Sequence, residues 1–383
     1  MRWDVGIDLG TESVRMAMLK EGPVLNEAAA LAFRDGYDTP FCGGDAAKRL
    51  IGRTCEGMRV DTPLRDGVLE NSFTIDRMFH WLYRQQESLS RKRRFSAVIT
   101  CAPFARPVQQ EAMLSAAIDA GAAAAALVRS DAAIAVGAGL DLNAPEAKLL
   151  VDLGAGKISA TLFTYGRVAA YGFLPYGMNH IDERIQRMIR TDCGYRIGLN
   201  SAREIKHTLG TAQPKTAPVD VIMHMTGFSM YDRLPRNFDV ETRPVIDACE
   251  DVVREIIGLC ASVVDNAPEE LSADLNDSGV MLAGGGARSG LWPDILASAF
   301  NLTARVHQTP GETTSLGAAI AAGVGVGLFK GYAEAAGVVN ARSTHAPNPQ
   351  WVRAYEDVYG IYADIYERIR PLNDRISILK IGE

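Results

Sequence analysis

The sequence predicts an α/β protein with two related lobes that face one cleft, and three observations lead to this class. The chain has 383 residues, which is enough for two domains of ordinary size. Apolar strand-like runs alternate with segments that have the spacing of amphipathic helices. The pattern of strand, Asp-Leu-Gly, polar tip and strand occurs twice, in GIDLGTESVRMAML at 6–19 and in LLVDLGAGKISATLF at 149–163. The two copies predict two lobes that each offer a hairpin to a shared cleft.

In the first half, buried runs predict strands and stepped apolar positions predict helices. The segment 74–86 has an apolar helical face, with Thr74 or Asp76 as the expected cap. The expected strands are 3–9, 13–19, 27–33, 95–103 and 125–130, and the expected helices are 44–52, 74–86, 107–120 and 132–140.

The second half begins with a strand at 147–154 that repeats the opening pattern. Amphipathic helices are expected at 177–189 and 200–209, smaller mixed strands and turns at 211–245, and a long helix at 245–265. A buried strand, a glycine turn and a helix follow in 278–300. In 351–369, Trp and Tyr recur at steps of three and four residues. This stripe favours a helix packed on the core over a binding site.

Composition and charge exclude several classes of function. Apolar residues make up 47% and charged residues 22% of the chain, the balance of a soluble globular protein. A net charge of −6 argues against nucleic acid as a partner. Six cysteines without a C-x-x-C pair suggest reduced thiols. The sequence shows no signal peptide and no apolar run of about 18 residues, so we expect a cytoplasmic protein.

The two hairpins and a glycine run have the chemistry of a phosphate site. Gly10 permits a tight reversal after Asp8, and the tip that follows carries hydroxyls and backbone N–H groups. Such a tip can wrap phosphate oxygens, while the aspartate can hold a hydrated divalent cation. The glycines at 284–286 follow the strand VMLA and let the backbone approach a flat ligand. An ordinary hairpin with a polar turn remains the alternative for the first stretch alone.

These three pieces in this order resemble the actin-like ATPase superfamily, whose fold has two ribonuclease-H-like lobes with a nucleotide cleft between them. Within it, residues 3–287 resemble MreB, the bacterial actin. The resemblance rests on DLGTESVR at 8–15, IGRTCEGMRVDTPLRDGVLENSFTIDRM at 51–78, VITCAP at 98–103, AIAVGAGL at 133–140, VDLGAGKIS at 151–159, SAREIKHTLG at 201–210 and PEELSADLNDSGVMLAGGGA at 268–287.

The resemblance implies an ATP-binding cytoskeletal protein that forms filaments with itself, in cell shape or intracellular positioning. A head-to-tail interface of this kind does not close and makes open polymers. The resemblance to MreB also implies how the chain divides into lobes and subdomains. Lobe I would comprise a core of 1–33, 76–145 and 331–383 and a small subdomain of 34–75; lobe II would comprise a core of 146–177 and 249–330 and a small subdomain of 178–248.

The resemblance further implies ATP and Mg²⁺ as cofactors and names the residues that would hold them. The metal would be held by Asp8 and Asp152. The phosphates would lie against the two hairpin tips and the adenosine against the glycine run. The implied nucleotide-binding residues are Gly10, Thr11, Glu12, Ser13, Gly154, Ala155, Gly156, Lys157, Lys206, Gly284, Gly285, Gly286 and Arg288.

Two departures from the MreB pattern bear on catalysis. Relatives usually carry Glu-Glu-Pro before the 132–140 helix, and here Arg129, Ser130 and Asp131 occupy those positions. Asp131, with Asp152, is the catalytic candidate; otherwise Asp131 caps the following helix. In relatives the second hairpin usually carries hydroxyl side chains near the γ-phosphate, and here Lys157 stands among those positions. Lys157 would either meet the γ-phosphate as a point charge or face solvent. These departures are compatible with binding of ATP but argue against its fast hydrolysis. Slow ATPase activity is therefore the expectation that stays open.

Two other functions compete with the cytoskeletal one. The segments GGGARSGLW at 284–292 and ETTSLGAAIAAGVGVGLFKGYAEAA at 312–336, with the aromatic tail, resemble the FGGY carbohydrate kinases. That resemblance implies a small-molecule kinase. The third hypothesis is a nucleotide-binding regulator that does not turn ATP over.

A basic run before the 95–103 strand suggests contact with an anionic membrane. It consists of Arg91, Lys92, Arg93 and Arg94, followed by Phe95. Each basic residue near such a surface contributes about 1 kcal/mol. The expectation is weak peripheral contact at the inner face of the membrane; a solvated charged loop is the alternative.

Overall fold

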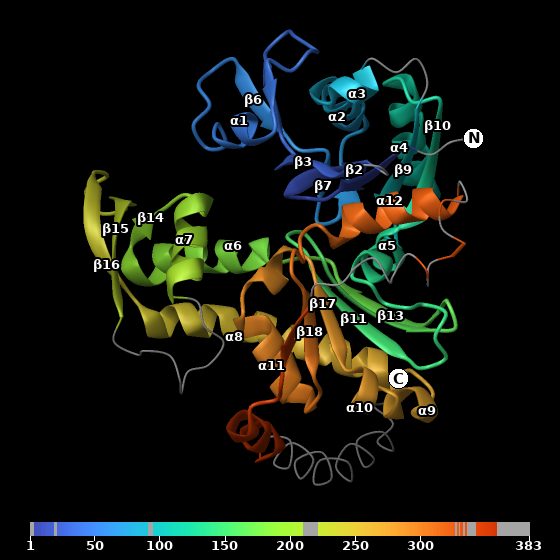
Figure 1. Cartoon of the computed structure of the whole chain (residues 1–383). Coiled ribbons are helices and arrows are strands. Elements are labelled where there is room, and N and C mark those ends of the chain that lie inside the picture. The colour runs from blue at the N-terminus through green and yellow to red at the C-terminus, as the bar shows by residue number, and fades with distance from the viewer. Residues whose placement is uncertain are drawn as a thin grey trace, which may run out of the picture.

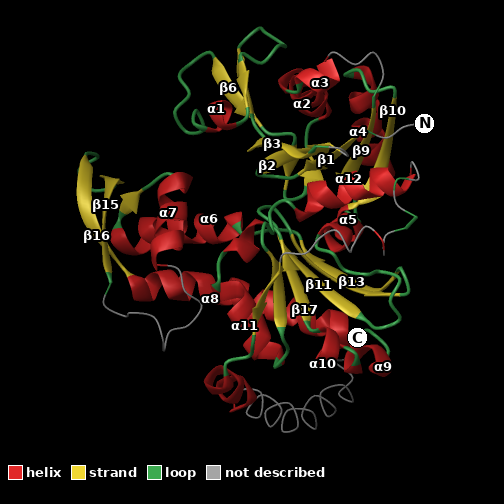
Figure 2. Cartoon of the chain, in the orientation of Figure 1, coloured by secondary structure: helices red, strands yellow, loops and turns green. Residues whose placement is uncertain are grey.

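The computed structural model describes residues 4–18, 21–90, 95–209, 221–325 and 342–357, together with 328, 330, 331 and 334. Its two lobes are each built on one large sheet, and a small subdomain extends from each lobe on the same side of the molecule (Figure 1). Helices cover the sheets and also lie between the lobes (Figure 2).

The sheet of the first lobe has the order β10-β9-β1-β2-β3, and that of the second has β13-β12-β11-β17-β18-β19. The first is formed by β1 (Val5–Leu9), β2 (Ser13–Met18), β3 (Gly22–Ala28), β9 (Ser96–Cys101) and β10 (Ala124–Arg129). The second is formed by β11 (Lys148–Leu153), β12 (Ile158–Thr164), β13 (Arg167–Leu174), β17 (Val280–Ala283), β18 (Ala304–His307) and β19 (Arg342–His345).

The repeat in the sequence is a repeat in topology. β1-β2-β3 is an antiparallel meander, and β9 and β10 continue the sheet in parallel from β1. β11-β12-β13 repeats the meander, and β17 and β18 take the places of β9 and β10. The predicted two-lobed α/β class is therefore confirmed. The strands β3, β13 and β18 were not predicted.

Each sheet has its own apolar core. In the first lobe, α2 (Ser72–Gln85) and α4 (Pro107–Asp119) pack together over the sheet, and α3 (Glu87–Ser90) follows α2. The cap of α2 differs from the prediction. Asn71 caps the helix, because its Oδ1 accepts from the backbone N–H groups of Phe73 at 2.9 Å and Thr74 at 3.3 Å. Thr74 and Asp76 lie inside the helix.

Two helices connect the lobes at the base of the cleft. α5 (Ser130–Gly137) leads from β10 to β11, and α12 (Thr313–Gly325) comes from the second lobe to pack on β1 and β9 of the first. Only small residues fit where they cross. A Cβ on Gly317 would overlap the carbonyl oxygen of Ala133, and a Cβ on Gly137 would overlap that of Thr313. Close packing of this kind holds the two lobes at a common base.

The small subdomain of the first lobe has a sheet of order β5-β4-β6 and a hairpin, β7-β8. Its elements are β4 (Leu31–Arg34), β5 (Cys42–Gly43), α1 (Asp45–Lys48), β6 (Met58–Asp61), β7 (Leu64–Arg65) and β8 (Val68–Leu69). The helix expected at 44–52 is thus a single turn.

The small subdomain of the second lobe has a sheet of order β14-β15-β16 beside two helices. Its elements are α6 (Asn179–Met188), the π-helical turn η1 (Ile189–Cys193), β14 (Tyr195–Arg196), α7 (Leu199–Leu209), β15 (Ile222–Ser229) and β16 (Pro235–Glu241). The long helix α8 (Thr242–Asp265) leads back to the core, where α9 (Glu269–Ala273), α10 (Leu275–Ser278), the 3₁₀ turn η2 (Gly285–Arg288) and α11 (Leu291–Phe300) lie.

The C-terminal part of the chain corrects the expected division. Residues 331–383 were assigned to the first lobe, but β19 pairs with β18 at the edge of the second sheet. The helical segment 349–357 follows, and Trp351 packs on the core of the second lobe (Figure 1). α12, which was assigned to the second lobe, contacts both lobes: it packs on β1 and β9 of the first, and its Ile320 shares an apolar cluster with Leu150 and Met281 of the second sheet. The tail beyond 357, with most of the aromatic stripe, lies outside the described residues.

The apolar residues beside the basic run are buried. Phe95 is 5% exposed and lies edge-on to Tyr83, with ring centroids 4.8 Å apart, and Leu89 is 1% exposed. Phe95 therefore cannot meet a membrane as expected, because it belongs to the core of the first lobe. Residues 91–94 lie outside the described residues. In the described part of the chain, no helix has the length and apolar character needed to span a bilayer.

Candidate functional site

The two hairpin tips and the glycine run face one cavity between the lobes. The cavity has a volume of about 390 Å³ and is lined by 10–13 from the first lobe, by 154–157 from the second and by Gly284 and Gly285 after β17. This is within the range of small-molecule sites, which are clefts of roughly 300–1,000 Å³. Because each tip follows a central strand of its sheet, the repeat itself brings the tips together.

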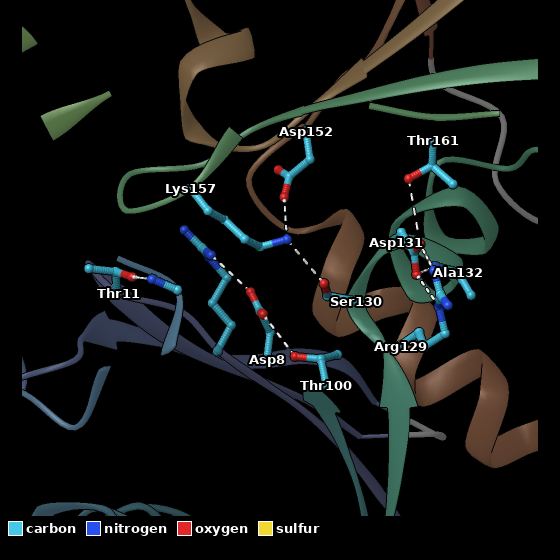
Figure 3. A network of polar contacts seen from close by, with 12 residues as sticks. Asp8, Thr11, Thr100, Arg129, Ser130, Asp131, Ala132, Asp152, Lys157 and Thr161 are labelled. Atoms are coloured by element: carbon cyan, nitrogen blue, oxygen red, sulfur yellow. Dashed lines mark hydrogen bonds and ion pairs between the residues drawn. The ribbon is translucent and has the colours of Figure 1, made fainter. Parts of the chain in front are cut away.

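Asp8 reaches the cavity from the end of β1. Its carboxylate accepts from Arg15 Nη1 at 3.1 Å and from Thr100 Oγ1 at 3.1 Å (Figure 3). Arg15 is the direct cross-strand partner of Asp8 in the β1-β2 hairpin. Burial raises the pKa of Asp8, and the charge of Asp152 across the cleft raises it further, against the opposing effects of Arg15 and Thr100.

Asp152 occupies the matching place at the end of β11, but it has a different cation. Its cross-strand partner is Ser159, so no basic residue of β12 faces it. Lys157 reaches back from the hairpin tip instead, with Nζ 3.3 Å from Asp152 Oδ2 and 3.2 Å from Ser130 Oγ (Figure 3). The Lys157 side chain is 13% exposed. Of the two expectations for Lys157, the solvent-facing one is therefore wrong.

Glycines are required where the pieces of the site meet. Gly284 has φ of +83°, and a Cβ there would lie 2.6 Å from Asp152 Oδ1. At Gly156, a Cβ would lie 2.7 Å from Thr11 Cβ, so the two tips are in direct contact. Thr11 Oγ1 in turn accepts from the backbone N–H of Gly67 in the β7-β8 hairpin at 3.0 Å. Segments of both lobes therefore meet at the cleft.

Glu12 links the lobes at the same place. Arg203 Nη1 of α7 donates to Glu12 Oε1 at 2.9 Å, and Lys48 of α1 forms an ion pair with the same carboxylate. Burial acts to raise the pKa of Glu12, but Lys48, Arg203 and Asn179 outweigh it, and the pKa lies below its usual range. Glu12 therefore stays ionised and holds α1, α7 and the first tip together.

Most of the predicted nucleotide-binding residues line this cavity. They are Gly10, Thr11, Glu12, Ser13, Gly154, Ala155, Gly156, Lys157, Gly284, Gly285 and Arg288, and both Asp8 and Asp152 lie with them. Gly286 is not in the lining; it lies against Leu153, where a Cβ would approach the Leu153 Cβ to 2.8 Å.

Lys206 does not reach the cavity. Its Nζ lies 2.6 Å from Asp182 Oδ1 and donates to the carbonyl oxygen of Met178 at 3.2 Å. Asp182 is buried at 1% exposure and also accepts from Arg203. A buried carboxylate needs a cation, and Lys206 neutralises Asp182 in this way. The predicted contact of Lys206 with a nucleotide is therefore unsupported.

Asp131 is likewise turned away from the cavity, which overturns its prediction as the base. It is 1% exposed, and Arg129 donates two hydrogen bonds to its carboxylate, from Nη2 to Oδ2 at 2.6 Å and from Nε to Oδ1 at 3.1 Å. Ser130, one residue earlier on α5, lines the cleft in its place. Figure 3 shows Asp131 pointing toward Thr161, away from Asp8 and Asp152. Its Oδ1 accepts from the N–H of Ala132 at 2.8 Å, but the alternative role as the helix cap is also wrong, because α5 begins at Ser130 with Arg129 as its N-cap and Asp131 lies in its first turn.

Several residues of the site were missed, and one of them had a signal in the sequence. Arg15 lies seven residues after Asp8; with the reversal at 10–13, that spacing makes the two direct cross-strand neighbours. Thr100, Lys48 and Thr314 also line the cavity. They come from distant elements, and no local pattern marks them.

The residues present do not fit a divalent cation held by the two aspartates. Both carboxylates already bind a cation of this chain, Arg15 or Lys157. The expected magnesium site at Asp8 and Asp152 is therefore not supported by the donor set.

The fold and the cleft define an actin-like two-lobed protein, and solved structures agree. MreB5 of Spiroplasma citri bound to ADP superposes with a TM-score of 0.77 at 22% identity, over 84% of this chain and 96% of that one. The MamK double helical filament superposes with a TM-score of 0.68 at 20% identity, over 83% of this chain and 98% of that one. At these identities, the likeness establishes the fold.

The chain belongs to the MreB/Mbl protein family, whose sequence model matches residues 2–324. The cell shape-determining protein MreB of Escherichia coli K12 is 29% identical over 289 residues, which cover 74% of this chain and 83% of that protein. The cell shape-determining protein Mbl of Bacillus subtilis 168 is 28% identical over 319 residues, covering 83% and 95%. The resemblance expected from the motifs is confirmed.

Proposed function

We propose that this chain binds ATP in the cleft between its lobes and assembles with itself into cytoskeletal filaments, in cell shape or in intracellular positioning. The observation that carries the proposal is the convergence of two matching acid-bearing hairpins on a single cavity. Relatives support both parts, since MreB5 is described bound to ADP and to AMPPNP, and MamK as a double helical filament.

ATP would act mainly as a clamp between the lobes. The phosphates would lie between the tips 10–13 and 154–157, which belong to different lobes and already touch at Thr11 and Gly156. A ligand that contacts both tips binds the closed arrangement better than an open one and so shifts the population toward it. Closure would then set the geometry of the surfaces that meet in a polymer.

Hydrolysis is proposed to be slow. Attack on the γ-phosphate requires an oriented water and a group that accepts its proton. Asp131 is held away by Arg129, and Ser130 occupies the place nearest the cleft. Asp152, the remaining catalytic candidate, is paired with Lys157. Binding and release of nucleotide, rather than rapid turnover, would therefore control assembly.

Electron microscopy and pelleting of the purified protein with ATP test this function. We expect filaments that form with ATP and are absent without nucleotide. ATP consumption that appears only when a sugar or polyol is supplied would instead establish the kinase alternative. Tight ATP binding with neither filaments nor turnover would establish the regulator.

Weak contact with anionic membranes at the inner face is the second part of the proposal, and it would depend on charge alone. Leu89 and Phe95 are buried, so the proposed contact rests on the charges of the basic run 91–94. Replacing its four basic residues with Gln should remove up to about 4 kcal/mol of attraction to an anionic surface.

Cosedimentation with vesicles measures this effect. We expect the wild-type chain to bind phosphatidylserine-rich vesicles at low salt and to lose that binding at high salt or in the Gln variant. Vesicles of phosphatidylcholine serve as the control. Equal binding to both kinds of vesicle, or unchanged binding by the variant, would exclude the basic run as the contact.

A further inference from the structure

The cleft contains two ion pairs where an actin-like site is expected to present bare carboxylates to a metal. Arg15 lies 3.1 Å from Asp8, and Lys157 lies 3.3 Å from Asp152. All four side chains are largely buried, with 14% and 9% exposure in the first pair and 13% and 9% in the second. Both pairs lie in the lining of the one cavity, between the two tips.

Lys157 is fixed in this position by three different elements. Its own tip turns it back toward Asp152, and Ser130 at the start of α5 accepts a hydrogen bond from its Nζ at 3.2 Å. Its aliphatic stem packs against the β7-β8 hairpin, where a Cβ on Gly67 would lie 3.0 Å from Lys157 Cδ. A lysine held on all sides keeps its ammonium group in the cleft instead of sampling solvent.

The ammonium group of Lys157 neutralises Asp152, as a divalent cation bound there would do. A polyphosphate needs positive charge to approach two carboxylates, and Lys157 and Arg15 supply two such charges. A divalent cation bound between the aspartates would lie a few ångströms from both basic groups, and its repulsion from each is twice that of a monovalent ion. Metal and lysine therefore compete for the same carboxylate.

We propose that Lys157, assisted by Arg15, replaces the divalent cation in this cleft, so that the chain binds ATP without magnesium. The inference rests on the proposed nucleotide binding and concerns how the same site balances the charge of the ligand. Lys157 would contact the terminal phosphates directly, and Asp152 would hold the ammonium group in position.

A titration of the full chain with a fluorescent ATP analogue, in magnesium and in EDTA, tests the inference. For the wild type we expect dissociation constants that agree within about threefold in the two buffers. For Lys157→Ala we expect the affinity in EDTA to fall by at least about tenfold and magnesium to restore most of it. Lys148→Ala is the matched control, because Lys148 pairs with Glu146 at the far end of β11 and should behave as the wild type.

The outcomes separate this inference from the proposed function. A wild-type chain that binds the analogue in magnesium but not in EDTA would overturn the inference and leave nucleotide binding intact. Absence of binding in both buffers would overturn both. The wild-type comparison requires no variant to fold. If Lys157→Ala proves unstable, Lys157→Gln gives an independent test, since it keeps much of the buried stem and removes only the charge: binding in EDTA should weaken, and unchanged binding there would contradict the role of Lys157.

Discussion

Gly285→Leu should abolish nucleotide binding while leaving the fold intact. Gly285 lines the cleft, and a Cβ added there meets no atom within 4 Å, so the new side chain extends into open space. That space is where the proposed nucleotide lies. We expect at least about a 100-fold loss of affinity for ATP, or about 2.7 kcal/mol, together with loss of ATP-dependent pelleting. Calorimetric titration with ATP measures the effect.

Gly258→Leu provides the control for this variant. Gly258 is exposed on α8, and a Cβ there also meets nothing within 4 Å, but the residue is not part of the cleft. The Gly258→Leu variant should bind ATP with the affinity of the wild type. If Gly285→Leu unfolds at the wild-type temperature and binds ATP normally, the nucleotide does not occupy this cavity.

Gly317→Ala should produce a large loss of stability. The added methyl group would overlap the carbonyl oxygen of Ala133, where α12 crosses α5. α12 cannot move away from α5 without a clash, because it is packed against β1. A Cβ on Gly6 of β1 would overlap the backbone of Ala319 in α12. Overpacking against backbone of this kind costs about 3 kcal/mol or more. Thermal unfolding followed by circular dichroism measures the loss.

Gly258→Ala is the matched substitution for this effect. It places the same methyl group on an exposed position inside α8, with nothing near it. Alanine is a better helix former than glycine by about 1 kcal/mol, so this variant should be as stable as the wild type or more so. Equal stability of Gly317→Ala and Gly258→Ala would show that the crossing is not tightly packed.

The fold and the hairpin tips could be predicted because their signals are local. An apolar strand that ends in Asp-Leu-Gly, followed by a polar tip and another strand, specifies a hairpin within about 14 residues of sequence. Two copies then specify two lobes. The cavity lining confirms that these tips meet, since Gly10 and Gly154 both border it.

The roles of single charged side chains could not be predicted, because they depend on the direction that the tertiary structure gives each side chain. Asp131 looked like a displaced base, yet its direction is set by the position of Arg129 at the end of β10. Lys206 looked like a nucleotide contact, yet it neutralises Asp182 on a neighbouring helix. A buried carboxylate attracts the nearest cation, and which cation is nearest is a property of the tertiary structure.

The contacts of the C-terminal segments with the two lobes could not be predicted for a related reason. α12 is rich in glycine and alanine, and its place on the first lobe depends on Gly6 leaving room for Ala319. β19 is on the second lobe because β18 offers an edge to pair with. Neither complementarity is visible in the sequence of the segment itself.

Hydrogen–deuterium exchange of the full chain with and without ATP shows whether the two tips bind one ligand. We expect ATP to slow exchange in both tips together, at 10–13 and at 154–157, because both bind the same polyphosphate. Protection of one tip alone, or of neither, in a protein shown to bind ATP would contradict this expectation.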